Sequence, residues 1–170
     1  HGIDGSEFIY CADKENVNPE IVEAWDDSER AKKLEQFSKL ANEDSSLIDI
    51  LDSERQFLNP EYCVNIKYNS DENGFAHAIM KRPDNKSFYV SFDTENLPYG
   101  LRWFCRTGDE DGVGFCLPTT GTNHSTKVQM KNGTFNILKG KSSTHLHYYF
   151  GMLGEKETNE MINYIKKIKE

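Results

Sequence analysis

The hydrophobic positions in the first third of the chain recur at the spacing of an α-helix. They lie three and four residues apart, which places them on one face of a helix. This stripe consists of Leu34, Phe37, Leu40 and Ala41. Upstream, Asn18 is a typical helix cap and Pro19 suits a first helical turn, so we expect a helix to begin there. A second short helix is expected from Ser45, which makes segment 9–60 mostly helical.

From residue 61 the pattern changes to an alternation of apolar and polar positions, which is typical of half-buried strands. The clearest alternating runs cover residues 62–68, 75–80 and 88–92. Turn residues separate about eight such runs. Asn132 and Gly133 favour a hairpin turn between a strand around Val128 and another around Ile137. We therefore expect segment 61–153 to form an antiparallel β-barrel or sandwich.

The last segment, residues 155–170, returns to helical spacing. Acids at its start and lysines at its end complement the helix dipole, and its apolar face is expected to pack against the sheet. The predicted fold class is α+β: an antiparallel β-barrel or sandwich of about eight strands with N-terminal helices and a C-terminal helix. Residues 9–170 would form one domain. Residues 1–8 match dipeptides that cloning sites encode, so we interpret them as a cloning remnant.

The chain is acidic, with 28 Asp and Glu against 20 Lys and Arg and a net charge of −8. Nearly all of this net charge lies in residues 1–60. An acidic chain without a basic run is not expected to bind nucleic acid, because phosphates attract clustered Lys and Arg. No apolar stretch approaches the roughly 18 residues that a membrane span needs, so no span is expected.

The cysteines favour two disulfides over a zinc site. There are four of them, and none stands in a C-x-x-C pair. A hairpin whose turn is centred on residues 110–111 would place Cys105 opposite Cys116, within reach of a disulfide. The remaining pair would then be Cys11 with Cys63, and a crossed pairing stays open.

Three N-x-S/T sequons lie in polar, turn-like stretches where a glycan is tolerated. Their acceptor residues are Asn85, Asn123 and Asn132. Together with the even number of cysteines, they predict a secreted, extracellular glycoprotein. A cytosolic protein with free thiols is the alternative.

Candidate chemistry is sparse along the chain. His145 and His147 would project from the same face of a strand and could bind a metal with His77 or His124 as a third ligand. We favour the simpler interpretation that the two imidazoles line a sheet face. The acidic residues 109–111 lack the spacing of a calcium loop, and no nucleophile elbow, phosphate loop or dinucleotide fingerprint occurs. We therefore expect no metal, no cofactor and no enzymatic activity.

The aromatic residues of the predicted strands suggest a ligand pocket. A closed barrel of about eight strands has room for one small ligand, and aromatic walls with a few polar groups suit such a site. A plain packed core stays open as the alternative. The candidate residues are Tyr62, Phe88, Trp103 and Tyr149 as walls, with His145 or His147 as the polar contact.

Three short motifs carry a resemblance to a known family. Glu23-Ala24-Trp25 is similar to the acid-Ala-Trp of a first helix, and Cys63-Val64 with a strand ending in Met80-Lys81-Arg82 is similar to a cysteine-bearing second strand. In these motifs the chain resembles the lipocalins, specifically the secreted salivary lipocalins of blood-feeding ticks. The resemblance implies a barrel that sequesters histamine, serotonin or a lipid mediator.

The expected function follows from the compartment, the aromatic residues and the resemblance. We expect an extracellular, non-enzymatic protein that sequesters a small hydrophobic, amphipathic or amine ligand in an aromatic pocket. The alternative is a secreted protein-interaction module, such as an immune modulator. Its acidic N-terminal helices would then steer a basic host protein toward one face of the molecule.

Overall fold

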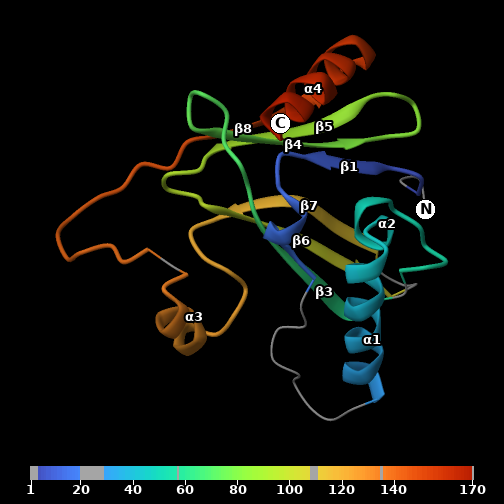
Figure 1. The fold of residues 1–170 in the computed structure, drawn as a ribbon, viewed down its shortest axis with the longest axis horizontal. Helices are drawn as coiled ribbons and strands as arrows, with labels where there is room; N and C mark the ends of the chain where they lie inside the picture. Colours follow the sequence, from blue (N-terminus) through green and yellow to red (C-terminus); the bar gives the residue numbers. More distant parts are fainter. Residues whose placement is uncertain (1–3, 20–28, 57, 108–110, 135, 170) are drawn as a thin grey trace.

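The strands of this protein form two separate antiparallel sheets (Figure 1). The computed structural model describes residues 4–19, 29–56, 58–107, 111–134 and 136–169. Within these residues, eight strands divide equally between the two sheets, and all paired strands run antiparallel. The sheets do not close on each other, so the expected α+β class is confirmed as a sandwich-like arrangement and the barrel is wrong.

Each sheet combines strands that are distant in the sequence. The first sheet contains, in spatial order, β1 (Glu7–Tyr10), β4 (Phe75–Lys81), β5 (Ser87–Asp93) and β8 (Tyr148–Leu153). The second sheet contains, in spatial order, β2 (Val17–Asn18), β3 (Leu58–Lys67), β6 (Tyr99–Arg106) and β7 (Asp111–Thr119). The short 3-10 helix η1 (Lys14–Asn16) lies between β1 and β2, where the chain passes from one sheet to the other.

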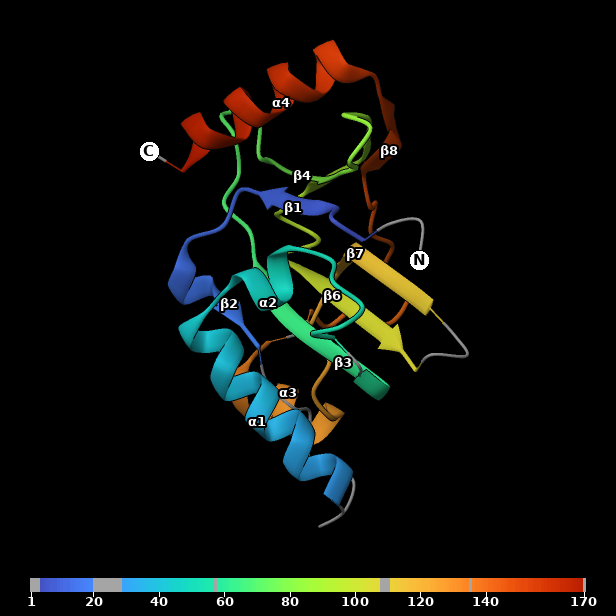
Figure 2. The ribbon, with the colours of Figure 1, turned by 90° about the vertical axis from the view of Figure 1, so that its right-hand side faces the viewer.

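Helices cover the sheets on two sides. Figure 2 shows α4 (Glu155–Ile168) lying across the first sheet, with the second sheet on the opposite side of that sheet. The helices α1 (Glu29–Glu43) and α2 (Ser46–Asp49) pack beside β3 and β1, and α3 (Thr126–Asn132) follows β7. Among the described residues, no helix combines the length and the apolar character needed to cross a membrane.

Aromatic rings contributed by strands and helices fill the core. Phe8 of β1 lies 6.1 Å from Phe104 of β6, measured between ring centroids, so the two sheets meet through these rings. The α1 stripe places Phe37 edge-on to Tyr62 of β3 at 4.9 Å. On the other side of the first sheet, α4 inserts Ile165, which is 1% exposed. The core is thus continuous from α1 through both sheets to α4.

A buried arginine links three parts of this core. Arg102 of β6 is 1% exposed, and its Nη1 donates to the carbonyl oxygen of Ile48 and to Oδ1 of Asp49, each at 2.7 Å. Its guanidinium carbon lies 4.4 Å from the ring centroid of Phe8 and 4.6 Å from that of Tyr10. Because an unpaired cation in a core is strongly unfavourable, these contacts are what allow the burial. They join the second sheet to β1 and to α2.

Several predicted elements are confirmed. The apolar stripe of the first third lies in α1, and the C-terminal helix is α4. The alternating runs at residues 62–68, 75–80 and 88–92 correspond to β3, β4 and β5.

The hairpin expected at Asn132 and Gly133 is wrong, because residues 126–132 form α3. Gly133 has φ of 65° and caps the helix in the left-handed conformation. An Asn-Gly pair favours a type I′ turn because glycine tolerates positive φ, and the same freedom suits a helix end. No strand is described between residues 136 and 147, and the next strand along the chain, β8, pairs with β5.

The register expected for β6 and β7 is also wrong. Cys105 lies opposite Gly112, and Leu101 lies opposite Leu117, so Cys116 is not across from Cys105. The alternation of β6 places Cys105 on the outer face of the sheet, whereas Cys116 is buried at 4% exposure. The two side chains therefore occupy different faces of the sheet.

The N-terminal region differs from the expectation in two ways. Excluding residues 1–8 from the fold missed β1, in which Phe8 is 5% exposed; their origin in cloning stays a prediction. The helix expected from Asn18 does not begin there, because Val17 and Asn18 form β2 and pair with β3. The rest of that expected helix, with the Glu23-Ala24-Trp25 motif, lies at residues 20–28, outside the described residues.

We predict that Arg102→Met lowers the free energy of unfolding by about 3 kcal/mol, because it leaves the Asp49 carboxylate without its cation. Urea unfolding measures this change. The matched control is Arg55→Met, which removes a surface ion pair with Asp44 of 2.9 Å and should cost less than about 1 kcal/mol. Equal losses in the two variants would contradict the role given to Arg102.

Candidate functional site

A cleft of about 190 Å³ opens where the end of β1 meets α1, α2 and the end of α4. Part of its wall is apolar, from residues such as Ala12, Val17 and Ile48. The rest offers an aromatic ring, a carboxylate, an amide, a hydroxyl and two ammonium groups. These side chains are Tyr10, Asp49, Asn42, Ser45, Lys14 and Lys169.

The carboxylate of Asp49 is the most constrained group in the cleft. Asp49 is the last residue of α2, whose preceding Ile48 is buried and fixes the helix against the core. Its Oδ1 accepts hydrogen bonds from Arg102 Nη1 at 2.7 Å and from the Tyr10 hydroxyl at 3.1 Å. Among the described residues, no hydrogen bond is made to its Oδ2. The side chain is 25% exposed, so one oxygen is held while the group still reaches solvent.

The environment keeps the two partners of Asp49, Tyr10 and Arg102, in defined protonation states. Burial raises the pKa of Tyr10 to about 12, so its hydroxyl stays protonated and donates to Asp49. Burial would lower the pKa of Arg102, but the nearby Tyr10 and Asp49 outweigh it and raise that pKa above its ordinary value. The guanidinium is therefore a permanent cation behind the carboxylate.

The end of α4 supplies a cation at the other side of the cleft. Lys169 caps α4, and its Nζ lies 5.8 Å from the centroid of the Tyr10 ring. The cleft thus has a hydrogen-bond acceptor at Asp49, donors at Lys169 and Lys14, and an aromatic ring between them. Such a combination can bind a small molecule that has several hydroxyl groups.

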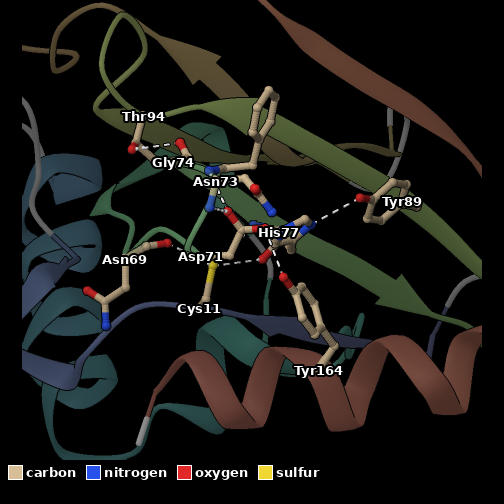
Figure 3. A network of polar contacts seen from close by, with 10 residues as sticks. Cys11, Asn69, Asp71, Asn73, Gly74, His77, Tyr89, Thr94 and Tyr164 are labelled. Carbon is tan, nitrogen blue, oxygen red and sulfur yellow. Dashed lines mark hydrogen bonds and ion pairs between the residues drawn. The ribbon is translucent and has the colours of Figure 1, made fainter.

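A second polar cluster lies on the α4 side of the first sheet, next to the cleft (Figure 3). Asp71 precedes β4, and its Oδ2 accepts from His77 Nε2 at 3.0 Å and from the Tyr164 hydroxyl at 2.9 Å. Its Oδ1 accepts the backbone N–H groups of Asn73 and Phe75, each at 2.9 Å. Burial would raise the pKa of Asp71, but these four hydrogen bonds outweigh it and lower the pKa to about 2.

The hydrogen bonds of this cluster are directed by the charge of Asp71. Since an ionised carboxylate only accepts, Nε2 of His77 carries a proton, and Nδ1 lies 3.0 Å from the Tyr89 hydroxyl. Both ring nitrogens of His77 therefore have protein partners. The cluster ties α4 to the turn before β4 through Tyr164, and it thereby fixes the helix that ends at Lys169.

Cys11 connects the two regions, because it lies between the cleft residues Tyr10 and Ala12 in the chain. Its Sγ accepts the backbone N–H of His77 at 3.1 Å and lies 3.1 Å from the carbonyl oxygen of Asn69. Burial raises the pKa of Cys11 to about 11, so the sulfur is a thiol at neutral pH.

The structure does not gather the residues predicted to form an aromatic pocket. Tyr62 is buried, with its hydroxyl 2.8 Å from Ser38 Oγ, and Trp103 lies on the outer face of the second sheet, where Nε1 donates to Glu61. Phe88 is half-buried within β5. Tyr149, His145 and His147 are exposed.

The expected cysteine pairs are not brought together either. Cys11 points into the core beside His77, whereas Cys63 lies on the outer face of β3, opposite Trp103. In the described part of the chain, no three His, Cys, Asp or Glu side chains form a group that could hold a metal ion. Asn85 and Asn132 are exposed and Asn123 is half-buried; their glycosylation stays a prediction.

Sequence reasoning missed Tyr10, Asp49, Asp71 and Lys169 as site residues. The turn around Asp71 was expected, but the partners of its carboxylate come from β4 and from α4, which are far away in the sequence. Asp49 and Lys169 have no distinguishing local pattern, because an acid after a short helix and a lysine at a helix end are common on protein surfaces.

A comparison with solved structures finds a similar fold. The chain matches a protein from Klebsiella pneumoniae assigned as an aldose 1-epimerase, with a TM-score of 0.62 and 18% sequence identity. The match covers 99% of this chain and 40% of the other, so this chain spans about two fifths of that protein's length. No protein-family profile matches the sequence, and no curated protein does. The similarity shows a shared fold.

This fold corrects the functional expectations. The resemblance to lipocalins is wrong, because the shared fold is that of a protein assigned as a sugar epimerase and the sheets form no barrel. The expectation of a non-enzymatic protein that sequesters an amphipathic or amine ligand is contradicted by the fold shared with a protein assigned as an aldose 1-epimerase. The secreted, extracellular location was drawn from the sequons and the cysteines, and it stays a prediction. The immune-modulator alternative is contradicted by the same shared fold, whereas a protein partner stays a prediction.

Asp71 predicts an acid-dependent loss of stability. Its pKa is about 2 in the folded chain against an ordinary 3.8. Its contribution to the free energy of unfolding is therefore present above pH 3.8 and is lost as the pH falls toward about 2. Unfolding free energies measured across this range should fall less steeply for Asp71→Asn than for the unmodified chain. Asp84→Asn, at an exposed turn, should keep the original slope. An unchanged slope for Asp71→Asn would contradict the assignment.

Proposed function

We propose that this chain binds a monosaccharide in the cleft at Asp49 and interconverts its two anomers by acid–base catalysis. The single observation that carries the proposal is the Asp49 carboxylate. Arg102 and Tyr10 hold its Oδ1, while Oδ2 has no hydrogen-bond partner among the described residues of the cleft. The fold shared with a protein assigned as an aldose 1-epimerase supports a sugar as the substrate.

The size of the cleft favours one sugar ring. Its volume of about 190 Å³ is below the roughly 300 Å³ at which pockets for drug-sized molecules begin. A pyranose has hydroxyl groups around its rim and C–H groups on its faces. Asn42 and Ser45 offer polar groups to the hydroxyls, and the ring of Tyr10 offers an apolar face to the C–H groups.

Anomer interconversion needs two proton transfers at opposite sides of one carbon atom. Asp49 Oδ2 would take the proton from the anomeric hydroxyl, and the ammonium group of Lys169 would give a proton to the ring oxygen. The bond between the anomeric carbon and the ring oxygen then breaks, and a carbonyl forms. After rotation about the adjacent carbon–carbon bond, the ring closes on the other face and both protons return. Nothing is oxidised or reduced.

The surroundings of the cleft support these two roles. Hydrogen bonds from Arg102 and from the Tyr10 hydroxyl to Oδ1 fix the orientation of the Asp49 carboxylate and leave Oδ2 directed at the substrate. Lys169 is positioned by α4, which is tied down by the hydrogen bond between Tyr164 and Asp71. Both groups are thus held before a substrate enters, which lowers the entropic cost of reaching a reactive geometry.

We predict that the chain accelerates the mutarotation of freshly dissolved α-D-galactose or α-D-glucose, as followed by polarimetry. Asp49→Asn should lower the catalysed rate by about 100-fold or more, because it removes the base while keeping an oxygen that can accept from Arg102. Lys169→Ala should lower the rate as well. Its side chain is at the surface, so the variant should fold normally.

Two matched controls accompany these variants. Glu43→Gln removes an exposed carboxylate at the end of α1, and Lys167→Ala removes an ammonium group from the last turn of α4; neither residue lines the cleft. Both should keep the unmodified rate. Thermal unfolding shows whether each variant is folded. No acceleration by the unmodified chain, or full activity in folded Asp49→Asn, would contradict the proposal.

A further inference from the structure

The strand β8 leaves an apolar surface uncovered at one end of the first sheet. Paired residues of antiparallel strands project to the same side, and β8 places Tyr148, Phe150 and Met152 opposite Phe92, Val90 and Phe88 of β5. Phe92 is fully buried and Val90 is 9% exposed in the core between the sheets. On the same face of β8, Tyr148 is nevertheless 57% exposed, Phe150 75% and Met152 61%.

The same strand also has a free edge. Among the described strands it is the last one of its sheet, with β5 on one side, and in Figure 2 it lies at the margin of that sheet. An edge strand presents unpaired N–H and C=O groups, and proteins usually protect such edges with charges, prolines or bulges. The six residues Tyr148–Leu153 contain no charged residue and no proline, so nothing in the strand opposes pairing.

We propose that β8 pairs antiparallel with β8 of a second copy of this chain, across a two-fold axis at Phe150. The two first sheets would then join into one sheet of eight strands. A strand added at the edge satisfies the free backbone groups and covers the apolar face at the same time, which a contact with the face alone would not do.

The register follows from the sequence of the strand. A two-fold axis keeps the apolar faces aligned only if it passes through a residue position, because a shift by one residue turns every side chain to the other face. Centring on Phe150 pairs Tyr148 with Met152 of the second copy on the apolar face. On the other face it pairs Tyr149 with Gly151. The space above Gly151 is open, because a Cβ added to this glycine would have no heavy atom within 4 Å. An aromatic ring opposite an edge glycine fills this space. Centring on Gly151 would instead pair the two glycines.

Sedimentation equilibrium tests the association. The unmodified chain should have twice the mass of one chain, and Phe150→Asp should have the mass of one chain, because the pairing would bury two carboxylates side by side. Phe150 is 75% exposed in the single chain, so this variant should still unfold cooperatively, at a temperature lowered only by the loss of the partner subunit. The control Ile137→Asp changes a residue that is 77% exposed outside the strand and should stay dimeric. A single-chain mass for the unmodified protein would overturn the proposal.

The register has its own test. Directly paired residues have Cα atoms about 4.5–5.5 Å apart, which is within the range of a disulfide. Phe150→Cys should therefore give a covalent dimer on mild oxidation, with a cross-linked peptide joining position 150 to itself. Ile137→Cys should give no such symmetric peptide. If the unmodified chain is dimeric but Phe150→Cys fails to cross-link at position 150, the interface lies elsewhere and the proposal is wrong. Neither result depends on the sugar activity, so the two proposals can fail separately.

Discussion

The burial of Arg102 is the constraint on which much of this structure depends. A cation at 1% exposure needs compensating partners, and those of Arg102 come from two other elements. The α2 helix supplies the Asp49 carboxylate and a carbonyl oxygen, and β1 supplies two aromatic rings. Arg102 itself lies in β6 of the second sheet. Losing the Asp49 carboxylate would leave the guanidinium without a counter-charge in the core. The relative position of β1, α2 and β6 is therefore set by electrostatics as well as by packing.

The same interaction creates the candidate site. Arg102 lies inside the core and Asp49 lies at the border of the core. The carboxylate of Asp49 is therefore held by Arg102 on the core side and faces the cleft on the other side. Tyr10 takes part twice, because its ring lies against Arg102 and its hydroxyl donates to Asp49. On the other side of Cys11, the half-buried Asp71 plays a comparable role for α4 through Tyr164. The charges of Arg102 and Asp71 thus determine where Asp49 and Lys169 lie.

Local periodicity predicted much of the fold, because α1, α4 and the strands β3, β4 and β5 each bury one regular face. Periodicity did not predict the buried face of a strand whose two faces both carry apolar residues. In β6, the residues Leu101, Trp103 and Cys105 form the more apolar face, yet Arg102, Phe104 and Arg106 are the buried ones. The buried face is decided by Asp49 and by the rings of β1, which lie far away in the sequence. The site was missed for the same reason, since its groups are ordinary surface residues until the fold brings them together.

Binding of a sugar against the Asp49 carboxylate is tested most directly by carbon-13 NMR of the aspartate carboxyl groups. On titration of the intact, labelled chain with D-galactose, the Asp49 resonance should shift in a saturable way. The Asp71 resonance should stay in place, because both of its oxygens are occupied by protein donors. An Asp49 resonance that does not move at saturating sugar concentrations would contradict the account.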